Sequence, residues 1–266
     1  MNIFVFGSTG MLGTYVTKYF SSKGYDVAPV SRKKMDIIKV TDRILINSNI
    51  NRGDVVINCA GLIKQRSGTT EYDFIKVNTM FPHMLAKTCN HKGARLIHVS
   101  TDCTYSGSKG GYDELAPHDA TDIYGRSKSL GEPSNTTVIR TSIIGEEQNN
   151  FLSLLEWVKS NQEKTVNGFT NHMWNGITCL KFAEVCEHII KHNIFWTSVK
   201  HIFSPNVVSK YELVKLISDI YDLNVKVIPV EAPNMCDRSL TSVRNDIIIP
   251  TEYLATQIQK MRDFAL

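Results

Sequence analysis

The stretch Asn2–Phe6 (NIFVF), followed directly by Gly7–Gly13 (GSTGMLG), decides the fold of this 266-residue chain. An apolar run of this length predicts a strand buried in a sheet. The glycine-rich turn then opens an amphipathic helix, and such a turn lets a pyrophosphate approach the backbone and bind the N–H groups at the helix N-terminus. An ordinary glycine turn is the alternative, but the position between strand and helix favours a dinucleotide site. The residues expected to bind the dinucleotide here are Gly7, Thr9, Gly10, Met11, Leu12 and Gly13.

The alternation of strands and helices continues through the first 140 residues. Several of the strands are apolar on both faces, as strands in a parallel sheet with two covered faces must be. The pattern predicts an α/β fold with a doubly wound, parallel, Rossmann-type sheet. The expected strands are 2–6, 26–30, 54–58, 95–101 and 136–140, and the expected helices are 11–23, 41–49, 72–91 and 123–132.

Beyond about residue 145 the pattern becomes less regular. We expect a dinucleotide-binding domain over 1–145 and a smaller C-terminal α/β substrate lobe over 146–266, interleaved into one cooperative unit. The expected elements of the lobe are helices 151–162, 180–192, 210–221 and 252–264, with short strands near 200–203 and 225–228.

The composition is that of an ordinary globular protein. Hydrophobic residues at 42% and charged residues at 21% exclude a disordered, collagenous or coiled-coil chain. The net charge of +4 suits an anionic small ligand but is too weak to indicate nucleic acid or a membrane surface. The six cysteines show no C-x-x-C spacing, so we expect neither a metal site nor a disulfide scaffold. With no visible leader or membrane-spanning stretch, we expect a soluble cytoplasmic protein, monomeric or homodimeric.

The ends of the second and third strands indicate which dinucleotide is bound. A ribose-binding acid is expected about 20 residues after the glycines, yet Ser31, Arg32 and Lys33 stand there with no acid among them. These residues can bind a 2′-phosphate, which favours NADP(H) over NAD(H), although a solvated basic turn is the alternative. The third strand ends in Cys59-Ala60-Gly61, where small residues let the cofactor ribose lie against the backbone.

A second group of residues carries the expected chemistry. The fourth strand ends at Thr101, at the sheet edge where open α/β folds bind ligands. Tyr124 and Lys128 follow on a predicted helix at a spacing of four, which places them on one helical face. An adjacent ammonium favours the phenolate, so Tyr124 is a candidate general acid for a carbonyl oxygen, with Thr101 as a second hydrogen-bond donor. A solvated helix face is the alternative interpretation of an isolated Y-x-x-x-K.

These motifs, taken in order, resemble those of the extended short-chain dehydrogenase/reductases. The segment 99–132 is similar to the dTDP-4-dehydrorhamnose reductase family of nucleotide-sugar reductases, through Ser100–Asp102, Tyr105–Gly107, Gly110–Glu114, Tyr124–Lys128 and Gly131–Glu132. The resemblance extends over essentially the whole chain, strongly to residue 140 and loosely afterwards.

The resemblance implies roles for individual positions. Thr101, Tyr124 and Lys128 match the family's catalytic triad, and Lys128 also bonds the nicotinamide ribose in such enzymes. Asp36 and Ile37 match its adenine-contacting pair. Asn78 matches an asparagine near the active site, although a surface amide is the alternative.

One departure from the family concerns Cys103, where rhamnose-type reductases commonly carry an aromatic residue. A cysteine at this position resembles bifunctional epimerase/reductases, in which a thiol and a second acid or base exchange protons beside a keto group. A thiolate could abstract such a proton, and His172 is the candidate partner because histidine titrates near neutrality. A small buried hydrophobe is the alternative for Cys103.

The remaining substrate residues come from the same resemblance. Asp102 follows the catalytic threonine, and Asn171, His172 and Trp174 lie in a segment similar to a substrate-binding loop. Trp174 could stack on a base or sugar, or belong to the core. Arg238 matches an arginine that contacts the substrate diphosphate, although the proline that usually follows it is missing, and a surface salt bridge is the alternative.

The sequence therefore predicts an NADPH-dependent reductase of a nucleotide-linked 4-keto-6-deoxy sugar, with or without epimerase activity. A catalytically silent NADP-binding regulatory subunit, similar to that of methionine adenosyltransferase, is the alternative from another class. A 4,6-dehydratase or 4-epimerase of the same superfamily is a third, which the basic end of the second strand disfavours.

Overall fold

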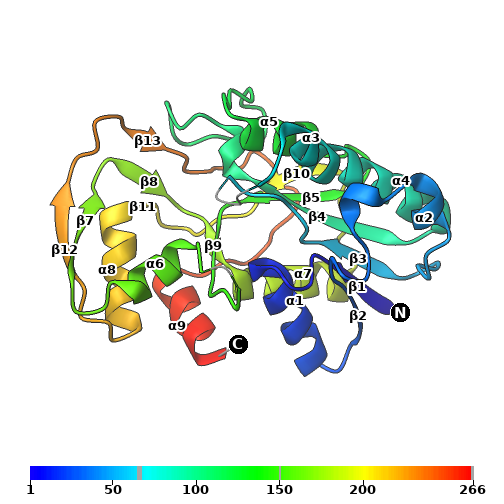
Figure 1. Cartoon of the computed structure of the whole chain (residues 1–266), viewed down its shortest axis with the longest axis horizontal. Helices are drawn as coiled ribbons and strands as arrows, with labels where there is room; N and C mark the ends of the chain where they lie inside the picture. Colours follow the sequence, from blue (N-terminus) through cyan, green and yellow to red (C-terminus); the bar gives the residue numbers. More distant parts are fainter. Residues whose placement is uncertain (65–67, 150, 265–266) are drawn as a thin grey trace.

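The central feature of the computed structural model, which describes residues 1–64, 68–149 and 151–264, is a six-stranded sheet (Figure 1). Its strand order is β2-β1-β3-β4-β5-β10, and every neighbouring pair is parallel. The expected doubly wound parallel fold is confirmed. The strands are β1 (Asn2–Phe6), β2 (Asp26–Val30), β3 (Val55–Asn58), β4 (Arg95–Thr101), β5 (Thr137–Thr141) and β10 (Ser198–His201).

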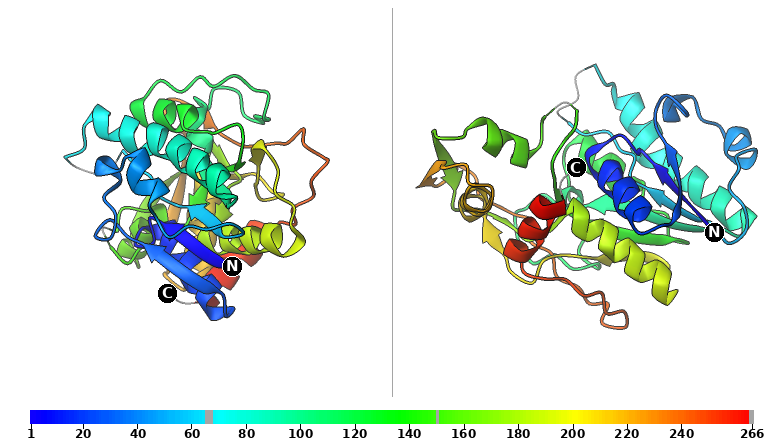
Figure 2. Two further views of the ribbon diagram at one scale, coloured as in Figure 1. Left: turned by 90° about the vertical axis from the view of Figure 1, so that its right-hand side faces the viewer. Right: turned by 90° about the horizontal axis from the view of Figure 1, so that it is seen from below.

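Helices cover both faces of this sheet because its strands are apolar on both sides. One face carries α1 (Met11–Ser22) and α7 (Cys179–His192), which lie side by side (Figure 2). The other carries α2 (Asp42–Ile46), α4 (Phe81–Lys92) and α5 (Ile123–Leu130). The chain runs from β1 to β2 on one side and then returns to β3 on the other side of β1. Ligands of such sheets bind at the carboxyl ends of the strands where the order reverses, which here is between β1 and β3.

One long helix of the sequence interpretation is a composite. The span expected at 72–91 consists of α3 (Glu71–Phe74), the π-helix η2 (Ile75–Met80) and α4, which follow one another without a break. The helix expected at 41–49 is shorter, since α2 ends at Ile46. Beyond it Ser48 Oγ donates to the Leu45 carbonyl oxygen, and serine and asparagine side chains compete with the helical backbone in this way.

The C-terminal part of the chain is divided between the sheet and a smaller lobe. α7 and β10 pack on or pair with the main sheet, while the other elements form small sheets and helices beside it (Figure 1). The division at residue 145 stays a prediction, and the core is continuous across it. The elements of the lobe and its connections are β6 (Ile143–Ile144), α6 (Leu154–Ser160), β7 (Thr165–Phe169), β8 (His172–Trp174), β9 (Ile177–Thr178), β11 (Val208–Ser209), α8 (Lys210–Ile220), β12 (Lys226–Val230), β13 (Cys236–Asp237) and α9 (Leu254–Phe264).

Two short 3-10 helices lie next to the expected ligand sites, η1 (Ile37–Lys39) after β2 and η3 (Asp102–Thr104) after β4. Among the described residues, no helix has both the length and the apolar character that crossing a membrane requires.

Candidate active site

The glycine-rich loop is built by close backbone packing. Gly7 has a φ of +74°, and a Cβ there would lie 2.8 Å from the backbone of Ala60 at the end of β3. A Cβ on Gly13 would lie 2.1 Å from the carbonyl oxygen of Gly7. Both positions therefore require glycine for the loop to close against β3 and α1. Gly10 differs, because its would-be Cβ meets nothing closer than the Gly7 oxygen at 3.4 Å.

The space beside Gly10 lies at the N-terminus of α1, where no side chain caps the helix. Gly10 is exposed and caps α1 without any side-chain hydrogen bond, whereas Asp122, Thr178 and Ser209 cap α5, α7 and α8 through their side chains. The N–H groups at the start of α1 thus point out of the loop uncapped, and such a helix end binds phosphate. This cradle fits a dinucleotide pyrophosphate held by the backbone of 7–13. Leu12 belongs to the core, so only its backbone can serve a ligand.

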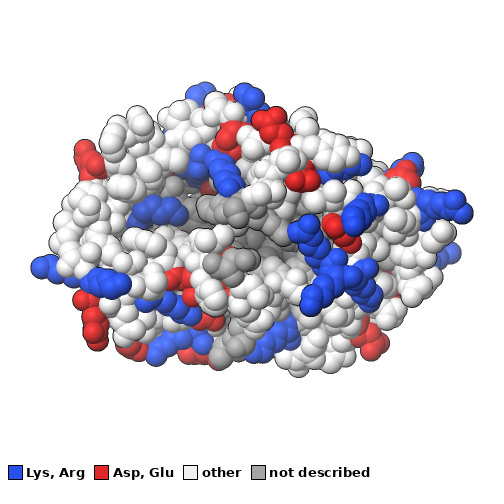
Figure 3. Space-filling view, viewed as in Figure 1, with Lys and Arg blue, Asp and Glu red and all other residues white. Residues whose placement is uncertain are grey.

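The segment after β2 is basic and lies beside this loop. Arg32 and Lys33 are exposed, and Nε of Arg32 lies 3.7 Å from Oδ1 of Asp36. Asp36 also accepts a hydrogen bond from the Ile38 backbone nitrogen at 3.3 Å, which starts η1. Figure 3 shows Lys and Arg side chains gathered on the half of this face where Figure 1 shows the N-terminal strands. The arrangement leaves these cations accessible to a phosphate.

Tyr124 reaches Thr101 because α5 packs very close to η3. A Cβ on Gly125 would lie 2.2 Å from the carbonyl oxygen of Cys103, so only glycine permits this approach. The Asp122 carboxylate starts the helix by accepting from the Gly125 backbone nitrogen at 2.9 Å. Burial, followed by the neighbouring Cys103, raises the pKa of Tyr124, and the nearby Thr101 hydroxyl opposes that rise. The hydroxyls of two of the three predicted catalytic residues are thus brought together.

The protonation of Tyr124 differs from the sequence-based expectation. We expected the Lys128 ammonium to favour the phenolate, yet burial dominates and the phenol keeps its proton. A protonated phenol is what a general acid requires, so the assigned role of Tyr124 stands while the reason given for it was wrong.

Lys128 is buried beneath the ends of the strands, with 4% of its surface exposed. Its Nζ donates to the Val99 carbonyl oxygen at 2.7 Å. Burial lowers the pKa of Lys128 to about 8, while Glu132 and Cys59 act in the opposite direction. Lys128 therefore lies between β3, β4 and α5, at the position from which it can reach a ligand on the sheet edge.

The lowered pKa of Lys128 predicts how stability depends on pH. An unfolded lysine titrates near 10.5, so between about pH 8 and pH 10.5 the unfolded chain binds more protons and stability rises with pH. Relative to Lys128→Met, we expect the wild type to gain up to about 3 kcal/mol in unfolding free energy across this window. Urea unfolding from about pH 7 to about pH 10 measures the difference, with the exposed Lys87→Met as control. A constant offset between wild type and Lys128→Met would contradict the assignment.

Asn78 proves to be a positioning residue inside η2. Its amide accepts from the Leu62 nitrogen at 2.8 Å and donates to the Leu62 carbonyl oxygen at 3.1 Å and to Ser127 Oγ at 3.1 Å. These bonds join the segment after Gly61 to α5 and use both donors of the amide. The expected direct cofactor contact of the Asn78 side chain is therefore not supported.

Cys103 and Asp102 lie beside Thr101, but their state does not suit a proton abstraction by the thiol. Burial, followed by the charge of Asp102, raises the pKa of Cys103 to about 12. Asp102 is 3% exposed, and its Oδ1 accepts from Thr101 Oγ1 at 3.1 Å. The thiol therefore keeps its proton near neutrality, and the structure gives no support to the epimerase hypothesis.

The side chains of Asn171 and His172, which were predicted to bind substrate, form hydrogen bonds with the backbone of 232–234. Asn171 exchanges hydrogen bonds with the Ala232 backbone at 2.8 and 2.9 Å, and His172 Nε2 lies 3.0 Å from the Asn234 carbonyl oxygen. Within the described part of the chain, no hydrogen bond joins either side chain to Thr101 or Cys103. Their sequence-based roles stay predictions without geometric support.

The structure places Trp174 in the core and Arg238 against the loop after η3. Trp174 is 4% exposed and belongs to the core, so it presents no face for stacking on a base or sugar. Arg238 donates from Nε to the Tyr105 carbonyl oxygen at 2.9 Å and from Nη2 to the Ser106 carbonyl oxygen at 3.3 Å. Arg238 directly follows β13, so these bonds join the loop after η3 to the end of that strand, and they use two of the five N–H donors of the guanidinium. Its predicted contact with a diphosphate stays a prediction.

Two features of the site were not found from the sequence. Arg140 is 2% exposed and forms two hydrogen bonds with Glu132 at 2.6 and 2.9 Å. Glu132 also accepts a hydrogen bond from Ser100 Oγ and raises the pKa of Lys128. The buried pair of Arg140 and Glu132 therefore contacts the strand that ends at Thr101 and helps to keep Lys128 charged. The second feature is Lys210 at the start of α8, which acts from the lobe on Asp102 and Cys103, the residues after Thr101. The only sequence signal was the presence of Glu132 in the motif after Lys128.

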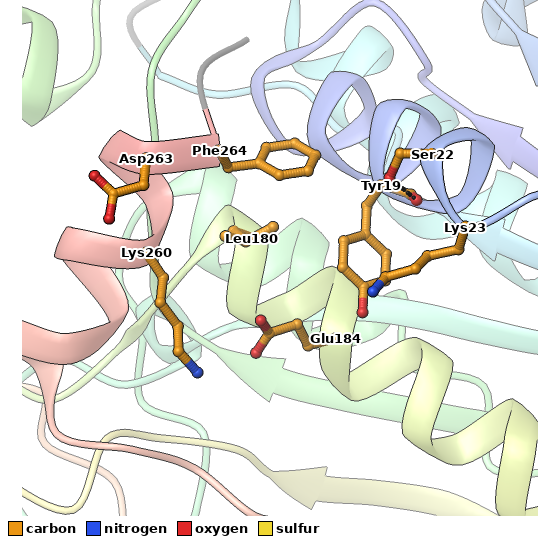
Figure 4. A pocket seen from close by; sticks show the side chains of 8 residues that line it. All are labelled: Tyr19, Ser22, Lys23, Leu180, Glu184, Lys260, Asp263 and Phe264. Atoms are coloured by element: carbon orange, nitrogen blue, oxygen red, sulfur yellow. Dashed lines mark hydrogen bonds between the residues drawn. The ribbon is translucent and has the colours of Figure 1, made fainter.

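The surface hollow in Figure 4 lies apart from this site. Its lining comes from α1, α7 and α9, on the face of the sheet opposite α5, and includes none of the candidate residues. It is lined by Tyr19, Ser22, Lys23, Leu180, Glu184, Lys260, Asp263 and Phe264.

Comparison with known protein families gives one match that extends over most of the chain. The model of the RmlD substrate binding domain matches residues 1–251. The chain belongs to the RmlD substrate binding domain family. The resemblance to this family inferred from the motifs is confirmed.

Curated proteins similar to this chain are named as reductases or as polysaccharide-biosynthesis proteins. A dTDP-4-dehydrorhamnose reductase of Mycobacterium tuberculosis is 36% identical over 149 residues, which are 51% of this chain and 48% of that protein. The chain thus matches about half the length of this relative. The spore coat polysaccharide biosynthesis protein SpsK of Bacillus subtilis is 27% identical over 86% of this chain and 82% of its own length.

A comparison with solved structures confirms the α/β fold of this chain. A dTDP-4-dehydrorhamnose reductase of Bacillus anthracis, solved in complex with NADP, superposes with a TM-score of 0.81 over 100% of this chain and 99% of that chain. The two sequences are 19% identical, so this likeness concerns the fold.

Proposed function

We propose that this protein is an NADPH-dependent reductase that acts on the C4 keto group of a nucleotide-linked 6-deoxy sugar. The observation that carries the proposal is the approach of the Tyr124 hydroxyl to Thr101, with Lys128 on the same helix, at the strand ends beside the glycine-rich loop. The names of the relatives, dTDP-4-dehydrorhamnose reductase and dTDP-4-keto-6-deoxy-D-glucose reductase, support the substrate class.

The residues present suit such a reaction. When bound, NADPH supplies the hydride. The backbone of 7–13 and Lys128 would hold the cofactor, and small residues at 59–61 leave room for its ribose. Tyr124, which keeps its proton, donates it to the sugar oxygen as that oxygen gains negative charge. Thr101 offers a second hydroxyl donor to the same oxygen once its proton turns away from Asp102.

The preference for NADPH over NADH rests on the segment after β2. Arg32 and Lys33 are exposed cations, and a 2′-phosphate beside them would gain charge-assisted hydrogen bonds. Asp36 lies next to Arg32 but is engaged in starting η1. A relative fold solved with UDP-glucuronic acid and NAD shows that this fold also accommodates the other cofactor, so the choice is assigned here to these basic residues.

Turnover is the decisive test of the proposal. We expect purified protein to oxidise NADPH with at least one freshly prepared dTDP-, UDP- or GDP-4-keto-6-deoxyhexose, and to use NADH at least about tenfold less efficiently. Absorbance at the nicotinamide band follows the reaction, and omission of the sugar is the control. Tight NADPH binding without turnover on any of these sugars would instead support the regulatory-subunit alternative, which nothing in the site geometry favours.

A further inference from the structure

Lys210 is a cation of the smaller lobe that comes close to the candidate active site. It is the first residue of α8, directly after β11. β11 pairs with β8, and Val208 lies opposite Trp174. The Lys210 side chain is partly buried, and its Nζ lies 5.3 Å from the centroid of the Trp174 ring. The tryptophan face therefore places the ammonium group through a cation–π contact.

The ammonium group of Lys210 faces the residues that follow Thr101. Burial lowers the pKa of Lys210, while Asp102 and then Cys103 act in the opposite direction. The same carboxyl of Asp102 is acted on by Arg238 and by Lys210. Lys210 thus reaches across from the lobe to the end of β4, which is where a ligand held between lobe and sheet would lie.

Lys128 and Lys181 are buried lysines with polar partners, whereas Lys210 has none among the described residues. Nζ of Lys128 donates to Val99, and Nζ of Lys181 pairs with Glu184 and Glu252. Among the residues that the structure describes, no hydrogen bond or ion pair is found for Nζ of Lys210, whose one polar contact is the Trp174 face. Withdrawing an ammonium from water without a compensating anion costs free energy, so the position is stabilised when an anion occupies the neighbouring space.

The balance of charge around Asp102 favours an anionic ligand. Two cations, Lys210 and Arg238, act on one buried carboxyl. Arg238 already spends two of its five N–H donors on the carbonyl oxygens of Tyr105 and Ser106, whereas the structure, over the residues it describes, shows no hydrogen bond from the Lys210 ammonium. Figure 3 shows a hollow between the two halves of the molecule, with Lys or Arg side chains in it on the side of β8 and β11.

We propose that Lys210 is a substrate-binding residue that pairs with the diphosphate of the nucleotide sugar, held in place by the ring of Trp174. This inference rests on the proposed function for its ligand. It gives Trp174 a positioning role in place of the stacking role expected from the sequence. The ammonium contributes to ground-state binding and does not take part in proton transfer at the keto group.

Substitution of Lys210 separates binding from chemistry. Lys210→Met keeps the side-chain stem over Trp174 and removes the charge, Lys210→Arg restores a charge, and Lys215→Met changes an exposed lysine of the same helix as control. We expect Lys210→Met to raise the KM for the keto sugar and the inhibition constant of the nucleoside diphosphate product about tenfold, as loss of a charge-assisted bond implies. We expect kcat to stay within about threefold, Lys210→Arg to recover most of the loss, and NADPH affinity to be unchanged. The melting temperature of ligand-free Lys210→Met should not fall, because the substitution removes a buried charge that forms no ion pair with any described residue.

Two results would overturn the inference. Unchanged KM and inhibition constants would show that Lys210 does not bind the diphosphate, and a loss confined to kcat would place it in the chemical step. If wild type turns over no sugar, calorimetric titration with dTDP, UDP and GDP tests Lys210 independently of the reaction. Binding of one of them by wild type and about tenfold weaker binding by Lys210→Met supports the inference; equal binding, or no binding by wild type, refutes it.

Discussion

Tyr124→Phe is expected to lower kcat by at least about a hundredfold, because positioned general acids contribute rate factors of about 10² to 10⁴. The substitution removes only the hydroxyl near Thr101 and leaves the ring packed against the cluster of Leu62, Phe74 and Val77. Because Tyr124 keeps its proton near neutrality, its loss leaves the developing oxygen charge without that acid. NADPH oxidation with the substrate identified in the turnover assay measures the effect.

The controls for Tyr124 distinguish chemistry from folding. Tyr72→Phe changes a tyrosine that is 60% exposed on α3 and should leave kcat unaltered. The affinity of Tyr124→Phe for NADPH should stay within about twofold of wild type, since the hydroxyl is assigned to the sugar oxygen. If Tyr124→Phe retained kcat within about threefold of wild type, another group would have to supply the proton.

Arg140→Met is expected to lower the free energy of unfolding by about 3 to 5 kcal/mol, the typical cost of breaking a buried ion pair by removing one partner. Arg140 and Glu132 are almost fully buried, at 2% and 6% side-chain exposure. Nη1 of Arg140 also bonds the Tyr105 hydroxyl at 2.5 Å and His201 Nε2 at 2.9 Å. Its removal leaves the Glu132 carboxylate and several polar atoms without their main partner, and the melting temperature should fall by about 10 °C.

A matched exposed pair provides the control for Arg140. Lys87 and Asp42 are 2.9 Å apart with side chains 72% and 46% exposed, so Lys87→Met should change stability by less than about 1 kcal/mol. Combining Arg140→Met with Glu132→Gln should restore part of the loss, because the unpaired buried charge is then gone. A change in the melting temperature of Arg140→Met no larger than that of Lys87→Met would show that the buried pair is not what holds β5 to the segment after α5.

The two predictions concern one connected region. Glu132 bonds Arg140 and acts on the pKa of Lys128, while Lys128 stands one helical turn after Tyr124. The helix that carries Tyr124 is therefore linked to the buried Arg140–Glu132 pair, which contributes mainly to stability. A moderate loss of kcat in Arg140→Met, measured well below its melting temperature, is consistent with this connection.

The features that could be predicted without the structure are those formed by residues close together along the chain. The glycine spacing in 7–13, the strand that precedes it and the four-residue spacing of Tyr124 and Lys128 are local patterns. Backbone conformation and helix periodicity act over a few residues, so the loop, the α/β fold and the shared helical face could be predicted.

Contacts between side chains of different elements, and the depth at which those side chains are buried, became visible only in the folded protein. Trp174 lies in the core, and the Asn78 amide forms hydrogen bonds with the backbone of Leu62. From the sequence, either residue could equally have contacted a ligand. The pKa of Tyr124 is set by burial and not by its sequence neighbour Lys128. The Arg140–Glu132 pair and the approach of Lys210 to Asp102 join residues from separate elements. Desolvation and charge pairing depend on these distances in space, which local sequence patterns do not encode.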